Sequence, residues 1–176
     1  MKDFREVKAG KKWFKKDYVA IMLWFVGRAI QAAAAMDKTV RKEFEELPDR
    51  FTFSLSVMPA GPHMIVGKSK RGIVHYLGWD PEGKDITLRM KIKNIEAAML
   101  LFTFQESTVV ATARDRLIVD GEVPHACAVV RILDIVEVYL LPKFIAKLAV
   151  KRYPAESPGK RLSRRLLLYV RTILGV

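Results

Sequence analysis

Histidine, cysteine and paired carboxylates are the side chains from which hydrolytic, redox or metal chemistry is usually built. The chain has three histidines and one cysteine, and His125 and Cys127 stand two positions apart near a predicted helix start. Side chains two apart on a helix point in different directions, so ordinary packing is expected rather than a zinc or nucleophile site. His63 and His75 fall on predicted strands, without metal-ligand spacing.

The acidic pair Asp120 and Glu122 flanks Gly121 just before a predicted helix. Carboxylates at that position favour the positive end of the helix dipole, so a structural role is favoured over acid–base work. The sequence contains no phosphate loop, dinucleotide fingerprint, metalloprotease helix or nucleophile elbow. We therefore expect no catalytic residue, no metal site and no cofactor.

The net charge of +12 comes mainly from the two ends of the chain. Residues 1–17 carry +4 and residues 151–176 carry +6, whereas the 133 residues between them carry only +2. Basic ends attract anionic membrane surfaces or nucleic acid through the same Coulomb attraction. The single cysteine excludes an intramolecular disulfide and fits a reducing cytoplasm.

Residues 18–30 are almost wholly apolar and are interrupted only by Arg28. As a helix this run spans about 20 Å, less than the roughly 30 Å hydrocarbon core of a bilayer. Extending it to Met36 includes Arg28 and Gln31, which are costly in mid-bilayer. Acidic residues before the run are unusual for a secretory leader. We expect a long helix, buried on one side or lying at an interface, rather than a membrane span or a signal peptide.

Alternation of apolar and polar residues predicts strands in the middle of the chain. The clearest strands are residues 51–57 and 86–92, where every second residue is apolar. Shorter apolar runs at 64–66, 73–77 and 117–119 predict three more, separated by turns rich in glycine and proline. Because short connections join the first four strands, we expect an antiparallel-type sheet with one solvated face.

Helical patterns occupy most of the remaining chain. Asn94 and Ser107 are suitable N-caps, and Pro142 interrupts a long apolar helical run. The predicted helices span residues 95–104, 107–113, 126–141, 144–152 and 160–174.

Residues 115–134 resemble the closing part of sterol carrier protein 2 domains, in which a strand ending in an acidic-Gly-acidic turn leads into a helix. The positions that match are Leu117, Val119, Asp120, Gly121, Glu122, Ala126 and Leu133. The continuation over residues 134–143 is similar to bacterial ubiquinone-biosynthesis accessory proteins that carry this domain. The resemblance covers about residues 43–143 and departs from the family at residues 112–116, where many members have a Phe-Gln pair and a glycine.

The resemblance implies an α+β fold, a five-stranded antiparallel-type sheet covered by helices, with an apolar tunnel for a lipid tail between them. We expect this domain at residues 43–152, a basic helical extension at residues 1–42, and a linker with a basic amphipathic helix at residues 153–176. The side chains expected to line the tunnel are Leu101, Phe102, Val109, Val110, Leu117, Val119, Val130, Leu133 and Val136.

The last helix is predicted to be amphipathic. At 100° per residue, one apolar stripe contains Leu162, Leu166, Tyr169, Val170 and Ile173. Leu168 is the single large apolar residue on the opposite, basic half. A helix of this kind either docks its stripe on the domain or lies on an anionic membrane. The expected membrane contacts are Lys160, Arg161, Arg164, Arg165 and Arg171.

The favoured hypothesis is a non-catalytic lipid carrier in the cytoplasm, peripherally associated with membranes. A polyprenyl quinone or its precursor is the preferred ligand class, with sterol, fatty acid and phospholipid as other candidates. A lipid-biosynthesis enzyme complex is a candidate partner. Two alternatives stay open: a scaffold that binds a partner helix, and a nucleic-acid-binding module. The latter would use Lys11, Lys12, Lys15 and Lys16, interleaved with Trp13 and Phe14.

Overall fold

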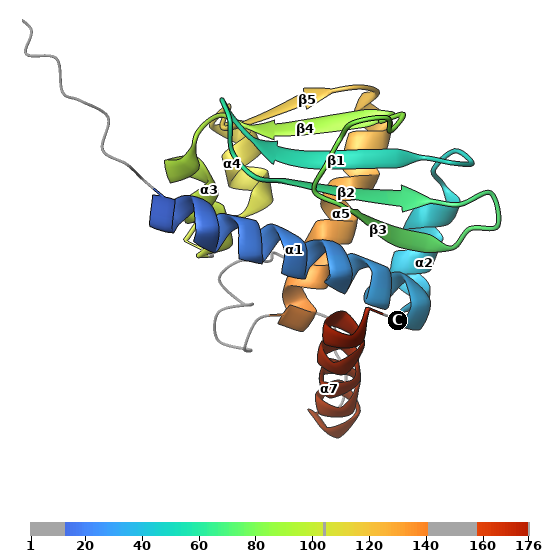
Figure 1. The fold of residues 1–176 in the computed structure, drawn as a ribbon. Coiled ribbons are helices and arrows are strands. Elements are labelled where there is room, and N and C mark those ends of the chain that lie inside the picture. The colour runs from blue at the N-terminus through green and yellow to red at the C-terminus, as the bar shows by residue number, and fades with distance from the viewer. Residues whose placement is uncertain (1–12, 104, 141–157, 176) are drawn as a thin grey trace, which may run out of the picture.

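The computed structural model describes residues 13–103, 105–140 and 158–175. Its centre is a five-stranded sheet with the strand order β3-β2-β1-β4-β5 (Figure 1). The strands are β1 (Thr52–Val57), β2 (His63–Lys68), β3 (Val74–Gly78), β4 (Leu88–Ile92) and β5 (Leu117–Asp120). The helices are α1 (Trp13–Met36), α2 (Lys38–Glu45), α3 (Ile95–Phe102), α4 (Thr108–Ala113), α5 (Val123–Leu140) and α7 (Pro158–Leu174).

The predicted α+β class and the five strands are confirmed, but the sheet is mixed rather than antiparallel throughout. Strands β1 and β4 pair in parallel, with Leu55 opposite Met90, and the other three pairings are antiparallel. A short connection favours a hairpin only when the next strand lies beside the previous one. Here residues 79–87 instead carry the chain from β3, at one edge, past β2 and β1 to the far side of β1.

Helix α1 packs its apolar face against β2, β3, α3 and α5, and nine of its residues are buried. The close approach depends on Gly27, where a Cβ atom would lie 2.6 Å from the Tyr76 ring on β3. By length and composition alone α1 could cross a membrane, a test that a core helix also passes. Its buried face belongs to the same hydrophobic core as β1, β4 and α5, so residues 13–36 are an integral part of the domain's packing.

Helix α2 is absent from the helices predicted from the sequence. Asp37 caps it by accepting hydrogen bonds from the backbone N–H groups of Thr39 and Val40. Val40 and Phe44, four residues apart, are buried against the core. At its end, the buried ammonium of Lys68 lies 2.8 Å from the carbonyl oxygen of Phe44, and it also donates to that of Leu47.

Helix α7 docks on the second half of α1 through a narrow face (Figure 1). Leu168 and Thr172 are buried there, and Tyr169 stacks on Phe25 with ring centroids 6.2 Å apart. Arg28 of α1 donates a 3.0 Å hydrogen bond to the carbonyl oxygen of Ile173. The docking face is thus centred on Leu168, the residue that the sequence marked as the exception on the basic half.

Candidate functional site

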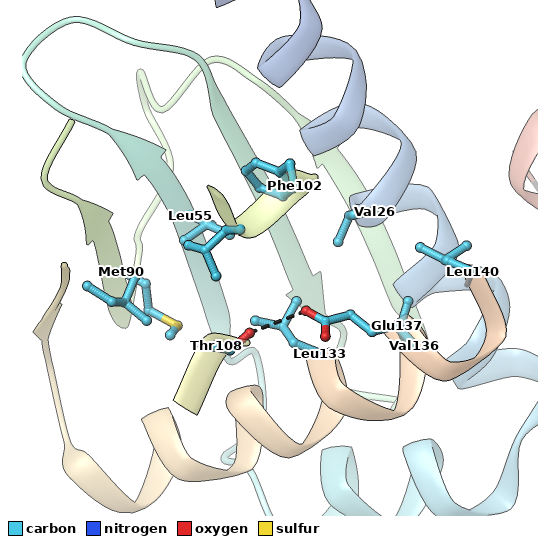
Figure 2. A pocket seen from close by; sticks show the side chains of 11 residues that line it. Val26, Leu55, Met90, Phe102, Thr108, Leu133, Val136, Glu137 and Leu140 are labelled. Carbon is cyan, nitrogen blue, oxygen red and sulfur yellow. Dashed lines mark hydrogen bonds between the residues drawn. The ribbon is translucent and has the colours of Figure 1, made fainter. Parts of the chain in front are cut away.

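An apolar pocket lies between the sheet and the helices (Figure 2). Strands β1, β4 and β5 contribute its sheet side, and α1, α3, α4 and α5 contribute its helical side. Eleven of the residues that the structure describes line it: Val26, Leu55, Met90, Leu101, Phe102, Thr108, Leu117, Leu133, Val136, Glu137 and Leu140. Nine of these are apolar, so the pocket suits hydrocarbon rather than a polar metabolite.

Local sequence patterns place these side chains together. Leu55 and Met90 are register partners on the parallel pair β1–β4, so they project from the same face of the sheet. On α5, Leu133, Val136 and Leu140 follow the three- and four-residue spacing of one helix face. That face lies against the sheet and forms the longest wall of the pocket.

The cavity volume is about 30 Å³. A water molecule needs roughly 10–15 Å³ by this measure, so the space holds about two groups of water or methylene size. The sequence predicted a tunnel for a whole lipid tail. In the part of the chain that the structure describes, the same region is a small cavity, and a longer chain enters only if lining side chains change rotamer.

Five of the nine side chains predicted to line the tunnel line this pocket: Leu101, Phe102, Leu117, Leu133 and Val136. The other four do not. Because α4 begins at the Ser107 cap, it turns Thr108 and Ala111 inward and leaves Val109 and Val110 exposed by 48% and 39%.

The remaining two predicted residues lie at the margin of the core. Val119 sits on the edge strand β5 and packs against the core without reaching the pocket. Val130 is half-buried and likewise packs against the core outside the pocket. The apolar character of a residue in the sequence does not show whether it lines the pocket or packs elsewhere against the core.

Glu137 is the functional candidate that the sequence analysis missed. Its carboxylate oxygen Oε1 accepts a 3.3 Å hydrogen bond from the hydroxyl of Thr108, which is itself buried (Figure 2). Burial raises the pKa of Glu137 to about 7, and the negative charge of Asp134 adds to the effect. Glu137 stands four residues after Leu133, so helical spacing alone would have placed it on the pocket face.

The histidine and the carboxylates that the sequence offered for catalysis contact neighbouring protein side chains. His125 lies edge-on to Phe51, with ring centroids 5.4 Å apart, and 3.5 Å from the carboxylate of Glu122. Asp120 pairs with Lys91 across the β4–β5 ladder at 3.3 Å. Across residues 13–103, 105–140 and 158–175, no group of three or more His, Cys, Asp or Glu side chains is placed to hold a metal ion.

Two of the four lysines in the basic N-terminal segment contact protein groups. Lys15 forms a 2.6 Å ion pair with Glu96, and Lys16 donates to the carbonyl oxygen of Ala60. Lys11 and Lys12 lie outside the described residues. Trp13 and Phe14 stack on each other at 3.9 Å and are largely exposed. This arrangement offers fewer unengaged cations for nucleic acid than the sequence alone indicated.

A second apolar surface lies on the outer side of α7. Leu166, Val170 and Ile173 are exposed by 66%, 45% and 64%, because the helix docks through Leu168 and Thr172 instead. Of the five predicted membrane contacts, Arg171 is half-buried in the last turn. The side chains of Lys160, Arg161, Arg164 and Arg165 lie outside the described part of the structure.

Among the solved structures that are similar to this chain are two domains of the sterol carrier protein 2 type. No protein-family model and no curated protein matches the chain. A solved UbiJ-SCP2 ubiquinone synthesis protein is 14% identical, with 73% of this chain and 100% of that chain covered and a TM-score of 0.42. Sterol carrier protein 2 like 2 from Aedes aegypti is 9% identical, with 57% and 94% covered and a TM-score of 0.33. Both structures are similar to this chain at low identity, and both carry the domain type that residues 115–134 resemble.

Proposed function

We propose that this protein is a non-catalytic lipid-binding protein that holds an apolar chain in the pocket between α5 and the sheet. The observation that carries the proposal is the concentration of nine apolar side chains around an internal cavity. Each methylene that a ligand buries there contributes about 0.8 kcal/mol before losses of entropy.

The size of the cavity favours a flexible chain over a rigid ring system. A space of about 30 Å³ admits a chain that advances methylene by methylene as side chains change rotamer. A fused ring system needs its whole volume at once, and close-packed interiors resist such a displacement. A polyprenyl or alkyl tail is therefore the preferred ligand class, and a polyprenyl quinone or its precursor fits that description.

The proposal extends to membrane contact through α7. Leu166, Val170 and Ile173 form an outward apolar face, and α7 also carries five basic residues and no acidic one. Apolar insertion combined with attraction to anionic headgroups is the usual mode of a helix lying at an interface. Such contact would keep a cytoplasmic carrier close to the bilayer that supplies its ligand and to a lipid-biosynthesis complex there.

The direct test of ligand binding is mass spectrometry of solvent extracts from protein purified without detergent. We expect a lipid with a long apolar tail at close to one molecule per chain. The matched control is Leu133→Trp, which fills the cavity from α5 and should strip the extract of that lipid. Extracts free of stoichiometric lipid, from protein first exposed to membranes, would contradict the proposal.

A further inference from the structure

The pocket is chemically asymmetric. Among the described side chains that line it, only those of Thr108 and Glu137 carry polar atoms near the cavity, and the two are hydrogen-bonded to each other (Figure 2). Thr108 comes from the start of α4 and Glu137 from the middle of α5. The lining side chains from α1, α3, β1, β4 and β5 present hydrocarbon and the thioether of Met90. Any polar atom on a ligand in this pocket therefore meets its hydrogen-bonding partners at one place.

We propose that Glu137 and Thr108 form a subsite that hydrogen-bonds a single neutral oxygen of the ligand, a hydroxyl or a carbonyl group. This inference rests on the proposed function, because it specifies which end group the bound lipid carries.

The hydrogen-bonding capacity of the pair supports the subsite. A carboxyl group has two oxygens, and the described structure gives Glu137 a single hydrogen bond, the one from Thr108 to Oε1. Buried polar groups are normally satisfied more fully than this. When protonated, Glu137 can donate to a ligand carbonyl, and when ionised it can accept from a ligand hydroxyl. A neutral oxygen is thus accommodated in either protonation state.

The charges around the subsite argue against an ionic end group. Asp134 lies one turn before Glu137 on α5, and the described residues that line the pocket include no lysine, arginine or histidine. An anionic lipid end would lie near one or two carboxylates without a cation to balance it. Burial also raises the pKa of Glu137 to about 7, so a neutral carboxyl group that can donate to a ligand oxygen is available near neutral pH.

The test is a competition at pH 8 among four twelve-carbon probes: dodecane, 1-dodecanol, dodecanoate and dodecylamine. The full chain is incubated with an equimolar mixture, separated by gel filtration and extracted, and the bound probes are quantified by gas chromatography. We expect 1-dodecanol to exceed dodecane by about fivefold to tenfold, the factor that one net hydrogen bond of about 1 kcal/mol provides. Dodecanoate and dodecylamine should both be under-represented relative to 1-dodecanol.

Two variants separate the subsite from a structural tether between α4 and α5. In Glu137→Leu we expect total uptake to persist while the ratio of alcohol to alkane falls to about one. In Glu137→Gln the alcohol preference should survive, because an amide also hydrogen-bonds. The share of dodecanoate should rise in wild type when the pH is lowered from 8 to 6, and it should rise less in Glu137→Gln, where only the probe's own carboxyl group gains protons.

The outcomes distinguish this inference from the proposed function. If wild type takes up none of the four probes, lipid binding itself is wrong. If it takes them up without preferring the alcohol, or if Glu137→Leu keeps that preference, the subsite is wrong while lipid binding stands. A preference for dodecylamine that disappears in Glu137→Leu would also overturn the subsite, in favour of a cation site.

Discussion

Glu137 introduces an ionisable group into the apolar wall of the pocket. Its pKa rises from 4.5 to about 7 because burial disfavours the charged form. The folded state then binds a proton that the unfolded chain has released between these two values, so stability falls as pH rises through that window. We expect Glu137→Gln to remove this loss and to be more stable than wild type at pH 8, by at most about 3 kcal/mol.

The measurement is urea denaturation of both proteins at pH 5 and pH 8. The difference in unfolding free energy should be small at pH 5, where the folded protein keeps Glu137 protonated. Two parallel pH profiles, with no gain for Glu137→Gln at the higher pH, would show that Glu137 titrates as an ordinary surface carboxylate.

Lys68 is a buried cation that serves the end of α2. Its ammonium donates to the carbonyl oxygens of Phe44 and Leu47 at 2.8 and 2.7 Å, where a cation favours the negative end of the helix dipole. The Phe44 carbonyl oxygen also accepts from the backbone N–H of Leu47. Lys68→Met keeps the aliphatic stem and loses both hydrogen bonds, so we expect destabilisation of about 2–3 kcal/mol. The exposed neighbour Lys70, changed to Met, should alter the unfolding free energy by less than about 0.5 kcal/mol. Equal effects of the two substitutions would contradict this role.

At the level of elements, the contact between α1 and the sheet depends on the absence of a side chain at Gly27. A Cβ atom there would lie 2.6 and 2.8 Å from two ring carbons of Tyr76. Gly27→Ala should destabilise the fold by about 1–3 kcal/mol through overpacking, although alanine favours the helix by about 1 kcal/mol. In a Tyr76→Leu background the same change should become neutral or stabilising. Thermal unfolding of wild type, Gly27→Ala, Tyr76→Leu and the double variant measures the coupling between the two positions. If the effects of the two substitutions simply add, Tyr76 is not what excludes a side chain at position 27.

Helix α7 presents its apolar stripe to solvent while it docks through Leu168 and Thr172. We therefore expect a triple change of Leu166, Val170 and Ile173 to Gln to weaken co-sedimentation with anionic vesicles by about tenfold or more. Substitution tests this face more cleanly than truncation at Pro154, because truncation also uncovers Phe25.

The control for this experiment changes Val109 and Val110, two exposed residues on α4, to Gln. That variant should bind anionic vesicles as well as wild type does. Wild type, the triple variant and this control should all bind neutral vesicles weakly. Unchanged binding of the triple variant to anionic vesicles would mean that α7 is not the membrane contact.

For the whole molecule, local periodicity predicted the five strands and most helices, because alternation and capping are local properties. The cap residues Asn94 and Ser107 lie where the sequence predicted them. The parallel pairing of β1 with β4 was not predictable, since it depends on where the chain crosses the sheet. Helix α2 was not predicted, because its two buried residues, Val40 and Phe44, are too few to show the periodicity of an apolar helix face.

The site was predicted only in part, for reasons that lie in packing. Apolar type selected Leu133 and Val136, which line the pocket, but it could not show that α4 turns Val109 outward. A search for apolar residues also passes over Glu137, whose position follows from spacing on α5 rather than from residue type. For α7 the sequence left two arrangements open, a stripe docked on the domain or a stripe facing a membrane, and the structure docks the helix through Leu168 with Leu166, Val170 and Ile173 exposed.

The central claim, that an apolar ligand occupies the pocket, is tested most directly by isotope-filtered NMR. Unlabelled 1-dodecanol is added to methyl-labelled protein, and contacts between ligand protons and protein methyl groups are recorded. We predict contacts to the methyl groups of Leu55, Leu133 and Val136, which line the cavity, and none to those of Val109 or Val110. Contacts confined to exposed methyl groups such as those of Leu166 and Ile173, with none inside the pocket, would contradict the account.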